Sequence, residues 1–199
     1  MTQFGSERSL VSSESTISMR VVRALVHAIE RAGVPRWKII QSARLTPEAL
    51  DNLDARMQRG EFYRLCEAAL DLTGDPAFAL HWSEQLAATA LDPIASLVAH
   101  SEDLGQALQT LSQYHRLLCD DLGYRVSEQK DQLLLHCVTL EGASERVQRF
   151  MAEATATRFM GLIRVFRSGA LPERVSFELG APAHEAEYAR VFGGRAHFN

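Results

Sequence analysis

The sequence predicts an α+β fold with a predominantly helical N-terminal half up to about residue 120. A small, largely antiparallel sheet and a long crossing helix are predicted for the C-terminal half. In the first half, apolar residues recur at spacings of three and four, the period of amphipathic helices. At residues 124–140 the period changes to two, which is typical of strands. The helical period returns over residues 145–167, which are predicted to form the crossing helix.

A serine-rich segment precedes the first helix. Residues 1–18 show little apolar periodicity, and such a composition cannot bury enough apolar surface to offset the entropy of ordering. We therefore predict a flexible arm over residues 1–18. Residues 19–199 are predicted to form a single domain, because a chain of 199 residues is within the usual size of one.

Short helices are predicted to follow one another in the first half. The first begins at Met19 and ends before Gly33 and Pro35, residue types that stop helices. Thr46 and Pro47 provide an N-cap and a first helical residue for a brief helix through residue 50. The other predicted helices cover residues 37–43, 61–72, 75–86, 94–99 and 102–119.

The second half begins with a predicted hairpin. Residues 124–126 and 133–140 form its strands, and residues 128–131 form its turn. After the crossing helix, alternation at Val175, Phe177 and Leu179 predicts another strand. A short helix over residues 184–192 and the beginning of a last strand at residues 195–198 complete the series.

The charge and the termini exclude several classes of protein. The net charge is -4 and the isoelectric point is about 6.0, whereas an autonomous nucleic-acid binder has a basic face. The N-terminus lacks the pattern of a secretory signal, and no apolar stretch approaches the roughly 18 residues of a membrane span. We predict a cytoplasmic protein that contacts neither a membrane nor, by itself, DNA.

Catalytic and metal-binding motifs are absent from the sequence. It contains no glycine-rich phosphate loop, no His-Glu-x-x-His and no Gly-x-Ser-x-Gly. The seven histidines are scattered, and Cys66, Cys119 and Cys137 lie far apart in apolar runs. The sequence predicts no metal, no cofactor and no enzymatic activity, and the three cysteines are predicted to be buried, reduced thiols.

Arg158 is the first candidate binding residue. It lies on the apolar face of the 145–167 helix, and a buried guanidinium needs a partner. Its planar fork suits a carboxylate or a phosphate, so a small anionic ligand is one candidate partner. An internal ion pair with Asp or Glu, or extension of the side chain to the surface, is the alternative.

Four further residues are candidates for the same site. His115 takes a place in the leucine stripe of the 102–119 helix, beside Tyr114, and His136 lies among apolar residues of the hairpin. If these elements pack together, Tyr114, His115, His136 and Arg158 line one apolar cavity with a few convergent polar groups. Separate hydrogen bonds within the core are the alternative. Glu153, about one turn before Arg158, is the candidate carboxylate for an amine.

Four stretches, taken in order, carry a resemblance to a known family. They are VVRALVHAIERAGV, FYRLCEAALDLTGDPAFALHWSEQL, SEDLGQALQTLSQYHRLLCDD and FELGAPAHEAEYARVFGGRAHFN. Together they resemble the N-terminal domain of AraC-type bacterial transcription regulators, in the branch that includes regulators of ornithine and arginine catabolism. The resemblance covers about residues 19–199.

The resemblance implies a domain that senses a small-molecule effector, such as an amino acid or a carboxylate, and forms a homodimer. It also implies that promoter DNA is contacted only through a C-terminal helix-turn-helix domain that is missing here, so that residues 195–198 continue into a longer protein. The family carries over no set of effector-binding residues by motif. A protein–protein interaction or dimerisation module without a small-molecule ligand is the alternative function.

Overall fold

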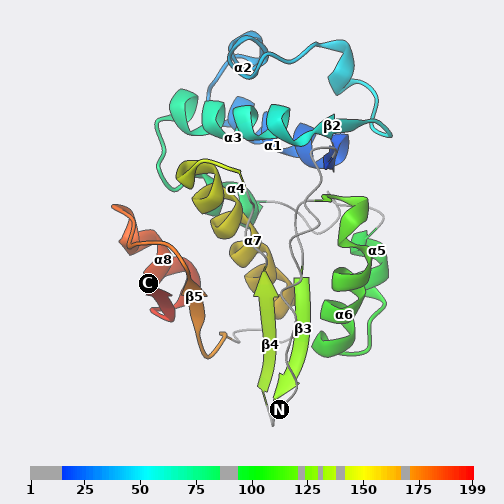
Figure 1. The fold of residues 1–199 in the computed structure, drawn as a ribbon, viewed down its shortest axis with the longest axis vertical. Coiled ribbons are helices and arrows are strands. Elements are labelled where there is room, and N and C mark those ends of the chain that lie inside the picture. Colours follow the sequence, from blue (N-terminus) through cyan, green and yellow to red (C-terminus); the bar gives the residue numbers. More distant parts are fainter. Residues whose placement is uncertain (1–14, 86–93, 121–123, 130–131, 138–141, 167–170) are drawn as a thin grey trace.

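The structure is a computed structural model. It describes residues 15–85, 94–120, 124–129, 132–137, 142–166 and 171–199. Helices α1, α2 and α3 gather at one end and the β3–β4 hairpin lies at the other, with α7 running between them (Figure 1). Helices α5 and α6 lie on one side of the hairpin, and α8 and β5 lie on the other (Figure 1). The predicted α+β class is confirmed.

The N-terminal helices follow the predicted order. They are α1 (Met19–Arg31), α2 (Arg36–Ala43), the 3-10 helix η1 (Glu48–Leu50), α3 (Arg59–Thr73) and α4 (Phe78–Gln85). The Ser18 side chain caps α1 by accepting a hydrogen bond from the backbone N–H of Arg20. Helix α3 ends at Gly74, whose left-handed backbone lets its N–H donate to Leu70. Helix α3 packs against α1 and α2.

The end of the predicted arm is ordered, so this part of the prediction is wrong. Strand β1 (Thr16–Ser18) pairs antiparallel with β2 (Arg56–Gln58), and neither strand was predicted. Ile17 is buried, and the Arg56 guanidinium donates to the carbonyl oxygen of Thr16 at 3.0 Å. One apolar side chain and a distant arginine therefore order a serine-rich segment. Residues 1–14 lie outside the described residues.

The predicted helix over residues 102–119 is divided. It follows α5 (Ile94–Ala99) and consists of α6 (Leu104–Tyr114) and the 3-10 helix η3 (His115–Leu117). Asp103 caps α6 by accepting from the N–H of Gln106 at 2.8 Å. The helix ends early because Cys119 forms a β-bridge with Ile17 and the Leu118 carbonyl accepts from the N–H of Ser18.

The strands of the second half form separate pairs. The hairpin of β3 (Tyr124–Gln129) and β4 (Gln132–Cys137) is antiparallel, as predicted. Strands β5 (Val175–Phe177) and β6 (Ala196–Phe198) are instead parallel, because α8 (Glu185–Phe192) connects them as a crossover. The single sheet that we predicted is therefore wrong for the described residues. Residues 138–140, at the end of the predicted hairpin, lie outside them.

Helix α7 (Glu145–Phe166) is the predicted crossing helix and contributes to two hydrophobic clusters. The larger cluster joins α1, α3 and α4 to Phe150, Met151 and Ala154 of α7. The smaller cluster joins Met160 of α7 to aromatic residues of β5 and α8, including Tyr188. Residue 167, the predicted end of the helix, lies outside the described residues.

The cysteines are free thiols, and their burial differs from the prediction for one of them. Cys66 and Cys119 are buried, whereas Cys137 is exposed at the end of β4. Burial raises the pKa of the Cys66 thiol well above its ordinary value, so this sulfur stays protonated. Among the described helices, none is both long enough and apolar enough to cross a membrane.

Two glycines provide a matched test of the backbone. Gly74 has a φ of 66°, so Gly74→Ala should lower the free energy of unfolding by about 1 kcal/mol. Gly161 lies within α7, where an added Cβ meets no atom within 4 Å, so Gly161→Ala should raise it by about 0.5 to 1 kcal/mol. Urea denaturation measures both changes, and equal effects of the two substitutions would contradict the assigned backbone conformations.

Candidate functional site

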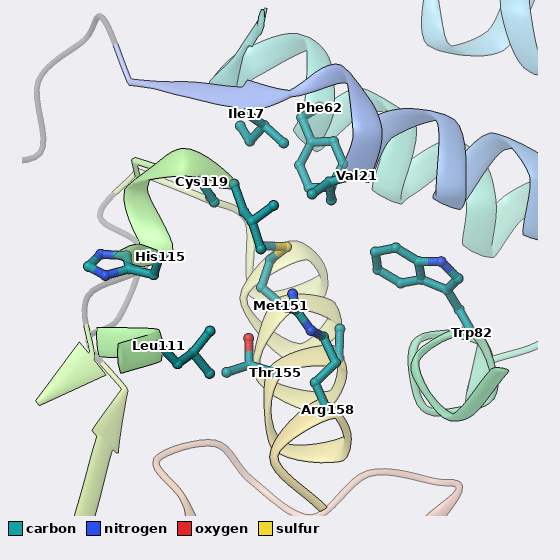
Figure 2. A pocket seen from close by; sticks show the side chains of 12 residues that line it. Ile17, Val21, Phe62, Trp82, Leu111, His115, Cys119, Met151, Thr155 and Arg158 are labelled. Atoms are coloured by element: carbon teal, nitrogen blue, oxygen red, sulfur yellow. The ribbon is translucent and has the colours of Figure 1, made fainter. Parts of the chain in front are cut away.

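A pocket lies between the first segments of the chain and helix α7 (Figure 2). One wall is formed by Ile17 of β1 and Val21 of α1, which belong to a continuous stretch of the chain. Phe62 of α3 and Trp82 of α4 form a second, aromatic wall. The pocket is therefore built from segments far apart in the sequence, and its shape depends on the whole helical half.

Helix α7 contributes a stripe of side chains to the pocket. Ala154 and Thr155 lie three and four residues after Met151, and Arg158 lies seven after it, so these residues project from one face of the helix. The opposite side is closed by α6 and η3, including Leu111 and the residues that follow η3. The predicted apolar face of α7 that contains Arg158 thus faces a pocket.

The pocket is narrow. It contains about 500 Å³ of space that no atom fills, part of which is open to solvent. The centre of a water-sized sphere can reach only about 30 Å³ of this space. Since one water needs roughly 10 to 15 Å³ by the same measure, the pocket in this conformation holds a few waters or a small chemical group. A larger ligand requires side chains to move.

Arg158 is the charged group of this pocket. The residue is half-buried and forms no hydrogen bond or ion pair with any residue in the described part of the chain. Its guanidinium points toward Met151, into the space between Leu111 and Trp82 (Figure 2). The internal ion pair considered from the sequence is thus not formed among the described residues.

His115 also lines the pocket, but its ring lies on the side away from Arg158 (Figure 2). Its Nδ1 lies 2.7 Å from the carbonyl oxygen of Ser112, which can only accept, so Nδ1 carries the hydrogen. Burial lowers the pKa of His115, and the nearby charge of Arg116 lowers it further, which outweighs the hydrogen bond to Ser112. The imidazole is therefore neutral at neutral pH, and among the described lining residues Arg158 alone supplies positive charge.

Two of the predicted site residues lie elsewhere. Tyr114 is 38% exposed at the end of α6 and does not line the pocket. His136 is exposed on β4, opposite Arg125 of β3. Our expectation that Tyr114, His115, His136 and Arg158 line one cavity is therefore correct only for the placement of His115 and Arg158. Tyr114 is the last residue of α6, and no described residue of the hairpin lines the pocket.

Glu153 lies outside the pocket as well, in the contact between α7 and α8. It is 1% exposed, and its Oε1 accepts hydrogen bonds from the Tyr188 hydroxyl at 2.6 Å and from His184 Nε2 at 2.8 Å. Burial raises the pKa of the Glu153 carboxyl, although these two hydrogen bonds act in the opposite direction. Glu153 therefore does not line the pocket, and its carboxylate already has two protein partners.

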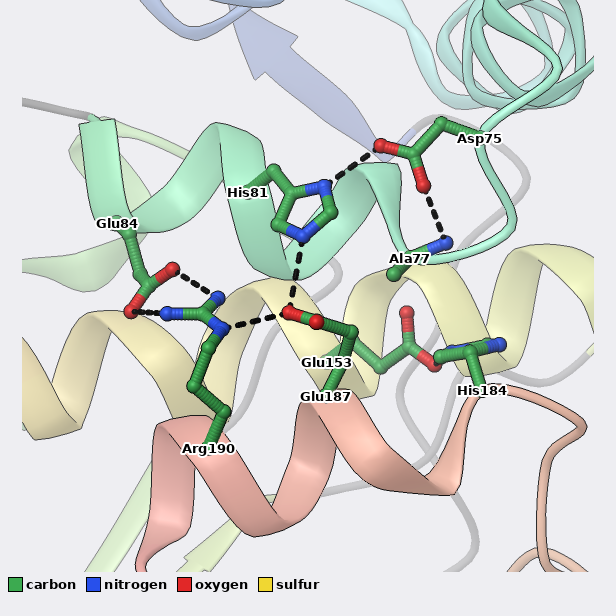
Figure 3. A network of polar contacts seen from close by, with 8 residues as sticks. All are labelled: Asp75, Ala77, His81, Glu84, Glu153, His184, Glu187 and Arg190. Carbon is green, nitrogen blue, oxygen red and sulfur yellow. Dashed lines mark hydrogen bonds and ion pairs between the residues drawn. The ribbon is translucent and has the colours of Figure 1, made fainter.

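A second polar network joins α4 to α8 (Figure 3). His81 of α4 lies between two carboxylates: Nδ1 is 2.6 Å from Asp75 and Nε2 is 3.0 Å from Glu187 of α8. Arg190 donates to Glu187 at 2.7 Å and also to Glu84 of α4 at 2.6 Å. Burial alone would lower the pKa of His81, but the hydrogen bonds and charges of Asp75 and Glu187 raise it overall.

Phe62, Trp82 and Thr155 are pocket residues that the sequence reasoning missed. The apolar spacing within α3 and α7 marked Phe62 and the neighbourhood of Thr155, but only as positions of the core. Trp82 carried a weaker signal, because α4 is short and its apolar residues do not form one stripe. No group of His, Cys, Asp and Glu side chains suited to a metal occurs in the described part of the chain.

Comparison with known proteins adds to this geometry. A sequence model described as "Arabinose-binding domain of AraC transcription regulator, N-term" matches residues 33–199. The chain is also similar to the ornithine utilization regulator of Pseudomonas aeruginosa, with 28% identity over 184 residues. That alignment covers 92% of this chain and 54% of the regulator, so the chain spans about half the length of its relative.

The network at His81 predicts a pH-dependent stability. His81→Gln removes the titrating ring between Asp75 and Glu187. Because the folded-state pKa of His81 is raised, its contribution is fully present below about pH 6.5 and is lost as the pH rises through the folded-state pKa. The melting temperature of the original protein should therefore exceed that of His81→Gln by more at about pH 6 than at about pH 8.5. His197→Gln, at an exposed position of β6, is the control, and a pH-independent difference for His81→Gln would refute the assignment.

Proposed function

Because this chain belongs to the family of arabinose-binding N-terminal domains of AraC transcription regulators, we propose that it is the small-molecule-sensing and oligomerisation domain of such a regulator. The resemblance inferred from the sequence is thereby confirmed. The family is one of regulatory domains and not a class of enzyme, which agrees with the absence of catalytic motifs from the sequence.

The observation that carries the proposal is the position of Arg158 in the pocket. A half-buried guanidinium that pairs with no described residue has lost part of its hydration without gaining a partner. An otherwise apolar pocket with one oriented charge is typical of a small-molecule site. A ligand bound there contacts α4 and α7 together, and it shifts the regulator between two states if it binds one of them more tightly.

The remaining parts of the proposal concern the longer protein. We propose that a helix-turn-helix domain outside this chain contacts promoter DNA, since the net charge of -4 does not suit this segment for that role. We also propose a cytoplasmic homodimer, because a two-fold regulator matches paired half-sites on DNA. Sedimentation of the purified chain tests the dimer: a species of monomer mass at micromolar concentration would contradict it.

A protein–protein interaction module without a ligand is the second candidate function. The narrow space in the pocket favours it, because the side chains already fill most of the volume between α1, α4 and α7. The two candidates differ in one measurable respect. A sensing domain is stabilised by a small molecule through mass action, whereas an interaction module is not.

The test is a thermal-shift screen of the chain against amino acids, sugars and small carboxylates, repeated with Ala154→Phe. Ala154 is 5% exposed and lines the pocket, so phenylalanine fills the binding space. We expect one chemical class to raise the melting temperature of the original protein and to lose this effect in the variant. Overpacking should by itself cost about 1 to 3 kcal/mol of stability.

The control is Ala186→Phe, which adds the same bulk at an exposed position of α8 and should leave the ligand effect intact. Circular dichroism verifies that both variants fold. In cells, Ala154→Phe placed in the full regulator should abolish the transcriptional response to the effector. A response that survives in this variant would exclude the pocket as the sensing site.

A further inference from the structure

We propose that the ligand of this pocket is a small carboxylate with an apolar body, and that Arg158 binds its carboxylate group. The inference rests on the proposed sensing function and specifies the chemistry of its ligand. The charges and the surfaces that line the pocket support this ligand class. The proposed ligand differs from ornithine, the dibasic amino acid in the name of the similar regulator.

The charge of the lining favours an anion. Arg158 contributes a permanent positive charge, and no Asp or Glu among the described residues lines the pocket. Glu153, the buried carboxylate of α7, is held by Tyr188 and His184 on the other side of the helix. The amino groups of a cationic amino acid would thus be desolvated beside Arg158 without a counter-charge, which is unfavourable. A carboxylate would gain two parallel charge-assisted hydrogen bonds from the same arginine.

The walls favour an apolar body. Phe62 and Trp82 present aromatic surface, and Ile17, Val21 and Met151 present aliphatic surface. The other polar groups on the lining are few, and His115 is neutral with its ring turned away from Arg158 (Figure 2). A sugar would bury several hydroxyl groups against these walls, at a cost for each group without a partner.

The size of the space favours a short ligand. The pocket, which holds only a few waters, becomes larger only when flexible side chains move. Met151 and Arg158 are the long, flexible side chains that α7 contributes to the lining. Aryl acids and acids with a short chain therefore fit the site better than long-chain fatty acids. Benzoate, phenylacetate and hexanoate are suitable probes.

Trp82 makes the site observable. The sequence contains two tryptophans, and Trp37 is 62% exposed on α2, away from the pocket. In a Trp37→Phe background, the fluorescence of the chain comes from Trp82 alone among tryptophans. This signal reports occupation of the pocket whatever the chemical class of the ligand.

The experiment titrates the Trp37→Phe protein with each of the three acids, with the corresponding amides and with L-ornithine. We expect the acids to change Trp82 fluorescence and to bind at least tenfold more tightly than their amides. Arg158→Gln should weaken binding of the acids about 10- to 100-fold, because it removes charge-assisted hydrogen bonds. Arg158→Lys, which keeps the charge but not the fork, should give a smaller loss.

Arg23→Gln is the matched control, since it removes one positive charge from an exposed position of α1. It should leave the affinity for the acids unchanged, and thermal melts verify that all variants fold. Equal binding of acids and amides, or full affinity in Arg158→Gln, would overturn the proposal. Binding of L-ornithine, but of none of the acids, would refute a ligand with an apolar body while leaving the sensing function in place. If Trp82 responds to no probe at millimolar concentration, the carboxylate proposal fails, and the sensing function is decided separately by Ala154→Phe in the full regulator.

Discussion

Helix α7 must bury side chains against two hydrophobic clusters at once, and most of the structure depends on this constraint. Glu145 and Arg146 of α7 are exposed, but a charged residue on one of the sides that face the clusters needs a partner. Glu153 obtains partners from α8, through Tyr188 and His184. Arg158 obtains none among the described residues, and the space beside it is the pocket. Glu153 and Arg158 lie close together on one helix, but only Glu153 has hydrogen-bond partners among the described residues.

Helix α8 forms hydrogen bonds with α4 and with α7, two of the helices that line the pocket. It contacts α7 at Glu153, and it contacts α4 at His81, which is the neighbour of Trp82 (Figure 3). A change in the relative position of α4 and α7 must therefore alter hydrogen bonds that hold α8. Networks of hydrogen bonds and packed helices of this kind carry energetic coupling between distant sites in proteins.

The sequence predicted what depends on local periodicity. Helices α1 and α7 and the β3–β4 hairpin follow from spacing alone, and the position of Arg158 in an apolar stripe correctly predicted that it faces the interior. The failures concern long-range placement. Strand β1 is ordered by residues some 40 and 104 positions away, and Tyr114 and His136 lie outside the pocket that the packing of distant elements forms. The position of Glu153 off the stripe of Arg158 was a signal that it belongs to another face.

The wall of the pocket that contains Ile17 and Cys119 has a consequence for the rate of folding. Its hydrogen bonds join Thr16 to Asp120, which are 104 residues apart. The hairpin and the β5–α8–β6 unit, in contrast, are closed by contacts that are local in sequence. Because the entropy of closing a long loop must be met before its contacts form, we expect this wall to assemble after the local units. A molecule bound against a wall that is not yet formed in the transition state should slow unfolding and leave the rate of folding almost unchanged.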